Sequence, residues 1–113
     1  MENRRGKRYK VRLKVRYGLE TPDTVGFLED ISSTGVRIKT NVVFKPGSTI
    51  KIEIVDEARH QILIVEGLVR WARKVPPAMV RTERCGMGIA FLKIDANMHQ
   101  FLLDLKNKHE GSG

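Results

Sequence analysis

The chain has 113 residues with a net charge of +8, and 41% of them are hydrophobic, which is typical of one folded domain and excludes a disordered chain. No apolar run approaches the roughly 20 residues that span a membrane, and no signal-peptide pattern opens the chain. The only cysteine, Cys85, excludes a disulfide within the chain, so we expect a reducing cytoplasm as its setting.

The positive charge is concentrated at the N-terminus. Residues 1–16 contain eight of the 21 basic residues and one of the 13 acidic residues, so +7 of the total charge of +8 lies there. We expect residues 1–8 to form a flexible basic arm, because they contain few apolar anchors. Such an arm attracts nucleotide phosphates, nucleic acid or an acidic membrane surface, unless it is only a solvated strand edge.

Six segments after the arm have the patterns of β-strands. Residues 9–17 alternate apolar and basic side chains, which is typical of a half-buried strand. Further strands are predicted at residues 24–31, 35–39, 50–55, 62–73 and 85–92, with a turn at residues 45–48. Gly67 indicates a bulge within the fifth of these strands.

The last segment changes to a helical period. Met98, Phe101, Leu102 and Leu105 recur on one face, and Asp95 is suited to cap the first turn, so we expect an amphipathic helix of about three turns. The predicted fold class is all-β or mainly β, a small six-stranded antiparallel β-barrel with a C-terminal α-helix. We place this domain at residues 9–108 and a flexible tail at residues 109–113.

Two short motifs point to a ligand. Arg4 and Arg8 form R-x-x-x-R on the arm, and Asp30, Ser32 and Gly35 form D-x-S-x-x-G between the second and third predicted strands. Guanidinium groups pair with phosphate and with the O6/N7 edge of guanine, and they stack on bases. A carboxylate accepts hydrogen bonds from the N–H edge of guanine. The two motifs together predict a pocket for a small, anionic ligand that contains guanine.

Each motif also has another interpretation. Arg8 and Arg12 fit R-x-x-x-R as well, but Arg12 lies within the alternating strand, so we favour Arg4 and Arg8. Asp30 and Ser32 also form a pair that is able to cap its own turn without a ligand.

The order and spacing of these motifs resemble those of the PilZ domain, the bacterial receptor module for cyclic di-GMP. The similarity extends to residues 86–91, which match a G-x-G-h-x-F strand of the family, and to the V-R-W run at residues 69–71. It spans roughly residues 3–105. The resemblance implies a second-messenger receptor rather than an enzyme, with cyclic di-GMP as its ligand and without catalytic residues, cofactor or metal.

The resemblance also assigns a role to each motif residue. It implies that Arg4 and Arg8 grip the phosphates and guanine edges of cyclic di-GMP while their planes stack on the bases. Asp30 would accept hydrogen bonds from the guanine N1/N2 edge, and Ser32 would bond a phosphate or a base. Gly35 would let the backbone of the turn approach the ligand closely.

Further contacts and the output are less sharply defined by the sequence. Arg5, Arg37 and Trp71 are possible additional contacts, although we expect Trp71 to lie in the core. Asn3 stands where an arginine in the family favours a bound ligand dimer, which leaves one or two ligand molecules open. Binding is expected to order the arm and so to signal to a downstream protein partner or a fused domain.

Three other function classes fit parts of the sequence. A small basic barrel that binds RNA or single-stranded DNA usually exposes aromatic side chains, whereas we expect Tyr9, Tyr17 and Phe27 on apolar faces of their strands. A PilZ-like interaction module without a ligand is disfavoured by the intact motifs. An enzyme is disfavoured because the three histidines lie in unrelated contexts without metal-ligand spacing.

Overall fold

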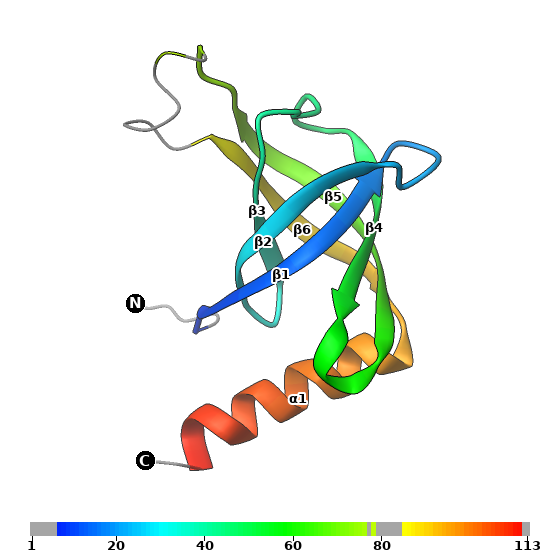
Figure 1. Ribbon diagram of the computed structural model, residues 1–113, viewed down its shortest axis with the longest axis vertical. Coiled ribbons are helices and arrows are strands. Elements are labelled where there is room, and N and C mark those ends of the chain that lie inside the picture. Colours follow the sequence, from blue (N-terminus) through cyan, green and yellow to red (C-terminus); the bar gives the residue numbers. More distant parts are fainter. Residues whose placement is uncertain (1–6, 77, 79–84, 112–113) are drawn as a thin grey trace.

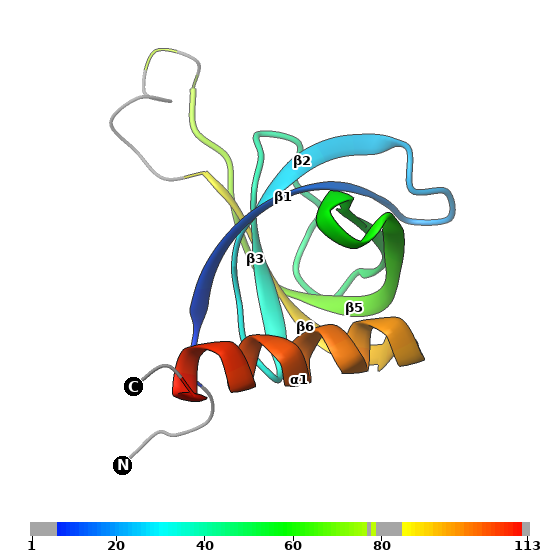
Figure 2. The same cartoon turned by 60° about the horizontal axis from the view of Figure 1, so that its bottom comes forward.

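The computed structural model describes residues 7–76, 78 and 85–111, in which six antiparallel strands close into a barrel and one α-helix lies across one end (Figures 1 and 2). Around the barrel the strands follow the order β1-β2-β3-β6-β5-β4. The elements are β1 (Tyr9–Gly18), β2 (Thr24–Ile31), β3 (Gly35–Lys39), β4 (Thr49–Asp56), a 3₁₀ turn (Glu57–Arg59), β5 (Gln61–Arg73), β6 (Gly86–Ile94) and α1 (Ala96–Gly111). The predicted fold class is confirmed.

The barrel closes because the strands alternate between an apolar inner face and a more polar outer face. Isoleucine, leucine and valine side chains from all six strands fill the interior, together with Tyr17 and Met87. Fully buried members include Val15, Leu28, Ile38, Ile50, Ile52, Ile54 and Leu63. The register between β5 and β6 shifts between Glu66 and Gly67, but the extra residue is Leu92 on β6, so the irregularity lies opposite Gly67 and not within β5 as predicted. A second bulge lies between Val69 and Trp71 and was not predicted.

Two aromatic residues were assigned to the wrong face. Phe27 is 41% exposed, because on β2 the inward positions belong to Gly26 and Leu28. Trp71 is 43% exposed instead of lying in the core, because the bulge between Val69 and Trp71 interrupts the alternation of β5. Both aromatic rings therefore lie on the outer surface of the barrel.

Helix α1 closes one end of the barrel, as Figure 2 shows from below. Met98 and Phe101 are buried against the core, and Leu102 and Leu105 pack beside them. The carboxylate of Asp95 accepts a hydrogen bond from the backbone N–H of Met98 at 2.8 Å, which is the predicted N-cap. The helix is longer than predicted and runs to Gly111.

Tyr17 ties the segment that follows β3 to the barrel. Its buried hydroxyl donates to the carbonyl oxygen of Val42 and lies 2.7 Å from the Thr40 hydroxyl. We expect Tyr17→Phe to lower the free energy of unfolding by about 1 kcal/mol, because the ring stays while the Val42 carbonyl loses its donor. Urea denaturation would measure this loss, with Tyr9→Phe on the half-buried Tyr9 as control. An unchanged unfolding free energy would contradict it.

Tyr17 also makes stability depend on alkaline pH. Burial raises the pKa of Tyr17 above its ordinary value of 10.0. The folded state therefore holds the phenol proton more tightly, and this contribution is present below pH 10 and lost as pH rises through the raised pKa. The Tyr17→Phe variant has no phenol to ionise, so its free energy of unfolding should not show this decrease at alkaline pH.

Candidate functional site

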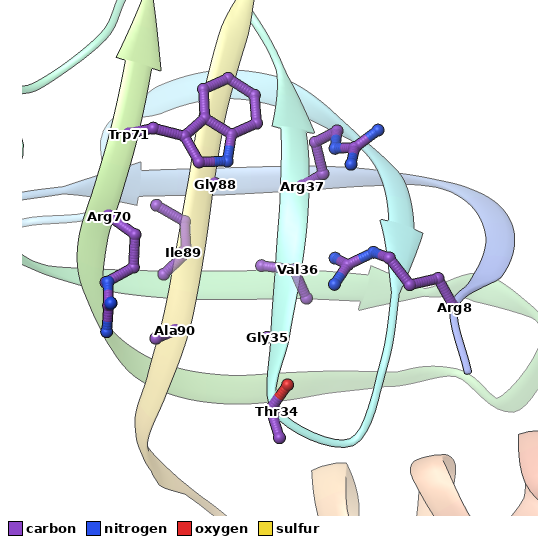
Figure 3. A pocket seen from close by; sticks show the side chains of 10 residues that line it. All are labelled: Arg8, Thr34, Gly35, Val36, Arg37, Arg70, Trp71, Gly88, Ile89 and Ala90. Atoms are coloured by element: carbon purple, nitrogen blue, oxygen red, sulfur yellow. The ribbon is translucent and has the colours of Figure 1, made fainter. Parts of the chain in front are cut away.

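A pocket of about 420 Å³ lies on the outer surface of the barrel over β3, β6 and β5 (Figure 3). This volume lies within the range of about 300 to 1,000 Å³ that is usual for small-molecule sites. The pocket is lined by Arg8, Thr34, Gly35, Val36, Arg37, Arg70, Trp71, Gly88, Ile89 and Ala90.

The floor of the pocket is made of residues with little or no side chain. Gly35 of β3 pairs with Ala90 of β6, and Arg37 of β3 pairs with Gly88 of β6. Gly35, Gly88 and Ala90 take outward positions on these strands and line the pocket, where Gly35 and Gly88 are buried and Ala90 is half-buried. Longer side chains rise around this floor, so a flat group could lie on it between charged walls.

Asp30 organises the basic wall of the pocket. The Nε of Arg8 donates to the Oδ1 of Asp30 at 2.6 Å, and the Nη1 of Arg37 lies 3.3 Å from the Oδ2 of the same carboxylate. The side chain of Asp30 is only 7% exposed, whereas those of Arg8 and Arg37 are 40% and 30% exposed. A buried carboxylate needs such partners, since an unpaired charge in this position would be strongly destabilising. Asp30 thus holds two arginines that face the pocket and does not line it itself.

Ser32 is buried beneath the same wall and is used mainly by its own turn. Its hydroxyl oxygen accepts hydrogen bonds from the backbone N–H groups of Thr34 at 3.2 Å and Gly35 at 3.3 Å. It also lies 3.4 Å from the Nη1 of Arg8. These hydrogen bonds within the turn agree with the alternative in which Ser32 caps its own turn. The same hydroxyl also contacts Arg8.

The packing of β3 against β6 explains why residue 35 is a glycine, without reference to a ligand. A Cβ at this position would collide with the carbonyl oxygen of Ile89 on the neighbouring strand β6. Among the described glycines only Gly47 and Gly86 have a positive φ, so Gly35 is required by close strand packing and not by an unusual backbone conformation.

Trp71 lies across Gly88 at the end of the pocket opposite Thr34 (Figure 3). A Cβ at Gly88 would collide with the Trp71 indole, so the glycine is what allows the ring to lie there. The guanidinium carbon of Arg37 is 5.9 Å from the centre of the Trp71 ring, a cation–π contact. The indole therefore forms an aromatic wall whose exposed surface is available for stacking.

The predicted site residues that the structure describes gather in one place. Arg8, Asp30, Ser32 and Gly35 lie together at one side of the pocket, and the possible additional contacts Arg37 and Trp71 line it as well. Arg4 and Arg5 lie outside the described residues. Arg12 lies on the outer face of β1, and its guanidinium carbon is 5.0 Å from the centre of the Phe27 ring. In the alternative R-x-x-x-R formed by Arg8 and Arg12, only Arg8 therefore lines the pocket.

Sequence reasoning missed Arg70 and Thr34. Thr34 occupies one of the unspecified positions of D-x-S-x-x-G, and Arg70 is the centre of the V-R-W run, to which no ligand contact was assigned. The available signal for Arg70 was its place beside Trp71. The described lining of the pocket contains three guanidinium groups, and the one carboxylate paired with two of them, that of Asp30, lies behind the wall, so the pocket favours an anion.

Neither a metal site nor a membrane-spanning helix is present in the described ranges. No group of three or more His, Cys, Asp or Glu residues in the described part of the chain is arranged to hold a metal ion. None of the described helices has the length and apolar content needed to cross a membrane.

Comparisons with known proteins show which family and which solved structures resemble this chain. The family model of the PilZ domain matches residues 2–107. No curated protein sequence matches the chain. Among solved structures, it is similar to the inhibitor of motility (MotI/DgrA) of Bacillus subtilis, with a TM-score of 0.77 and 20% identity over 99% of this chain and 53% of that one. The chain thus spans about half the length of that protein, and a likeness at this identity concerns the fold alone. Since the family model covers nearly the whole sequence, the chain belongs to the PilZ domain family.

Proposed function

We propose that this protein is a receptor for cyclic di-GMP and that it binds the ligand in the pocket over β3, β6 and β5. The PilZ domain family is a family of cyclic di-GMP receptors and of binding modules, which supports this function over catalysis. The observation that carries the proposal is the fixed position of Arg8, which Asp30 holds at 2.6 Å on the edge of a pocket floored by glycine and alanine.

The chemistry of the ligand matches that of the pocket. Cyclic di-GMP has two phosphodiester groups and two planar guanines in one ring. Arg8 and Arg37 present guanidinium groups for the phosphates or for the O6/N7 edge of guanine. The open floor and Trp71 offer flat surfaces to the bases.

The remaining motif residues act around Arg8 in this proposal. Asp30 and Ser32 lie behind the wall of the pocket and hold the Arg8 side chain, so in this proposal they act through Arg8. Arg4 and Arg5 precede Arg8 in the chain and would add contacts from the arm. Ordering of the arm over the bound ligand would then be the signal that a protein partner or a fused domain detects.

One titration tests this function. The single tryptophan, Trp71, lines the pocket, so its fluorescence reports occupation directly, and calorimetry gives the stoichiometry. We expect saturable binding of cyclic di-GMP at physiological salt, whereas GTP and a short single-stranded oligonucleotide should not compete at similar concentrations. The absence of binding to cyclic di-GMP would overturn the proposal.

One observation favours a second candidate, a barrel that binds single-stranded nucleic acid. Phe27 lies exposed on the outer face, paired in register with Lys14 on one side and Lys39 on the other. A basic surface with an exposed ring is the arrangement that stacks a base and neutralises its backbone. Salt-dependent binding of the oligonucleotide that Phe27→Ala weakens, without binding of cyclic di-GMP, would select this candidate instead.

A further inference from the structure

We propose that Arg70 is a third cationic contact of the ligand site and that it binds the half of cyclic di-GMP that lies away from Arg8. Arg70 would then make the site select the complete cyclic dinucleotide over a single guanosine nucleotide. This inference rests on the proposed function and adds to it a residue outside the R-x-x-x-R and D-x-S-x-x-G motifs.

The position of Arg70 is set by β5. Val69 is buried in the core, whereas Arg70 and Trp71 are both exposed and both line the pocket. The bulge between Val69 and Trp71 explains this arrangement, because it breaks the alternation that would turn one of two adjacent side chains inward. Two consecutive residues of one strand therefore serve the same pocket.

Arg70 and Arg8 flank the pocket from opposite sides. In Figure 3, Arg8 enters from the start of β1 and Arg70 extends from β5, with the floor strands β3 and β6 between them. A ligand that contacts both arginines must therefore extend across the floor. The two guanylate halves of a cyclic dinucleotide provide a phosphate and a guanine for each side, whereas one guanosine nucleotide provides only one set.

The net charge around the pocket also supports a role of Arg70 in binding. Asp30 is shared by Arg8 and Arg37, so these three residues together leave a single positive charge. Within the described residues, no carboxylate forms an ion pair with Arg70. Arg70 raises the local charge to +2, which matches the two phosphodiester charges of the ligand.

The guanidinium group suits this second contact better than other cations. Its planar fork donates two parallel hydrogen bonds to a phosphate or to the O6/N7 edge of guanine. The side chain is exposed and carries no competing ion pair in the described part of the chain, so little has to be broken before it binds.

The test compares Arg70→Ala with a matched loss of charge elsewhere. Lys14→Ala removes an exposed cation from the outer face of β1, at a position that does not line the pocket. Trp71 fluorescence is titrated with cyclic di-GMP and, separately, with GMP for wild type, Arg8→Ala, Arg70→Ala and Lys14→Ala. We expect Arg70→Ala to weaken cyclic di-GMP binding by about 10-fold, with GMP affinity unchanged and with Lys14→Ala close to wild type.

The outcomes separate this inference from the proposed function. If wild type binds cyclic di-GMP and Arg8→Ala weakens it, while Arg70→Ala behaves like Lys14→Ala, the role of Arg70 is wrong and the receptor function stands. Equal weakening of GMP and cyclic di-GMP by Arg70→Ala would overturn the assignment of Arg70 to the second half. No binding by wild type would overturn the receptor function itself. Thermal denaturation of each variant checks that the barrel remains folded.

Discussion

Replacing Arg8 with alanine is expected to weaken the binding of cyclic di-GMP by about 10- to 150-fold, which corresponds to the loss of roughly 1.5 to 3 kcal/mol. The variant removes a guanidinium that faces the pocket and that Asp30 fixes in place at 2.6 Å. Because the side chain is held before the ligand arrives, little freedom is lost when it binds, and the contact contributes most of its strength to affinity. Calorimetric titration measures the change.

Two further variants give this prediction its controls. Arg12→Ala removes the same type of side chain from β1, but from the outer face beside Phe27, so we expect near wild-type affinity. Arg8→Lys keeps the charge but not the planar fork, so its affinity should lie between those of wild type and Arg8→Ala. The fold should survive Arg8→Ala, because Arg37 still pairs with Asp30. Unchanged affinity of a folded Arg8→Ala variant would remove Arg8 from the site.

Replacing Gly35 with alanine should lower the free energy of unfolding by about 3 kcal/mol. The added Cβ would collide with the carbonyl oxygen of Ile89, so β3 and β6 must separate where they form the pocket floor. Both strands are central to a closed barrel, and neither can move outward without weakening its other pairing. Urea denaturation measures the loss, and ligand affinity measured on the folded fraction shows how far the floor is distorted.

Gly47→Ala is the matched comparison, since it separates steric collision from backbone strain. Gly47 has a φ of +95°, but nothing lies within 4 Å of a Cβ built there. We expect a smaller loss of about 1 kcal/mol, which comes from the left-handed conformation alone. If Gly35→Ala unfolds no more easily than Gly47→Ala but binds ligand much more weakly, the glycine serves the ligand and not the strand pairing.

The strand pattern could be predicted because alternation and turn residues agree along most of the chain. The bounds of β2 and β3 are the predicted ones, and those of the other strands differ by one or two residues. Alternation does not say which face is inner when both faces contain apolar residues, which is why Phe27 was placed inside. The 3₁₀ turn at Glu57–Arg59, followed by His60 with a φ of 54°, had no glycine or proline to mark it.

The site could be predicted only as far as its motifs reach. Arg8, Asp30, Ser32 and Gly35 are close together in space, as their spacing predicted. Their arrangement was not predictable, because it depends on β1 and β3 bringing Arg8 and Arg37 to the same carboxylate. The place of Trp71 was missed because it follows from the β5 bulge and from Gly88 on another strand, and such long-range contacts leave no local periodicity.

The closure of the barrel restricts how another protein can recognise this one. Each of the six described strands is hydrogen-bonded to a neighbour on both sides for at least part of its length, so no strand has an edge that is free from end to end. Along β1, for example, only residues 9–14 lack a partner on the side of β4. A partner therefore has only short stretches to which it can add a strand of its own, and the larger part of the accessible surface is made of side chains on the outer wall and on helix α1. Substitutions on the outer wall away from the pocket can then change the choice of partner while the ligand affinity stays constant.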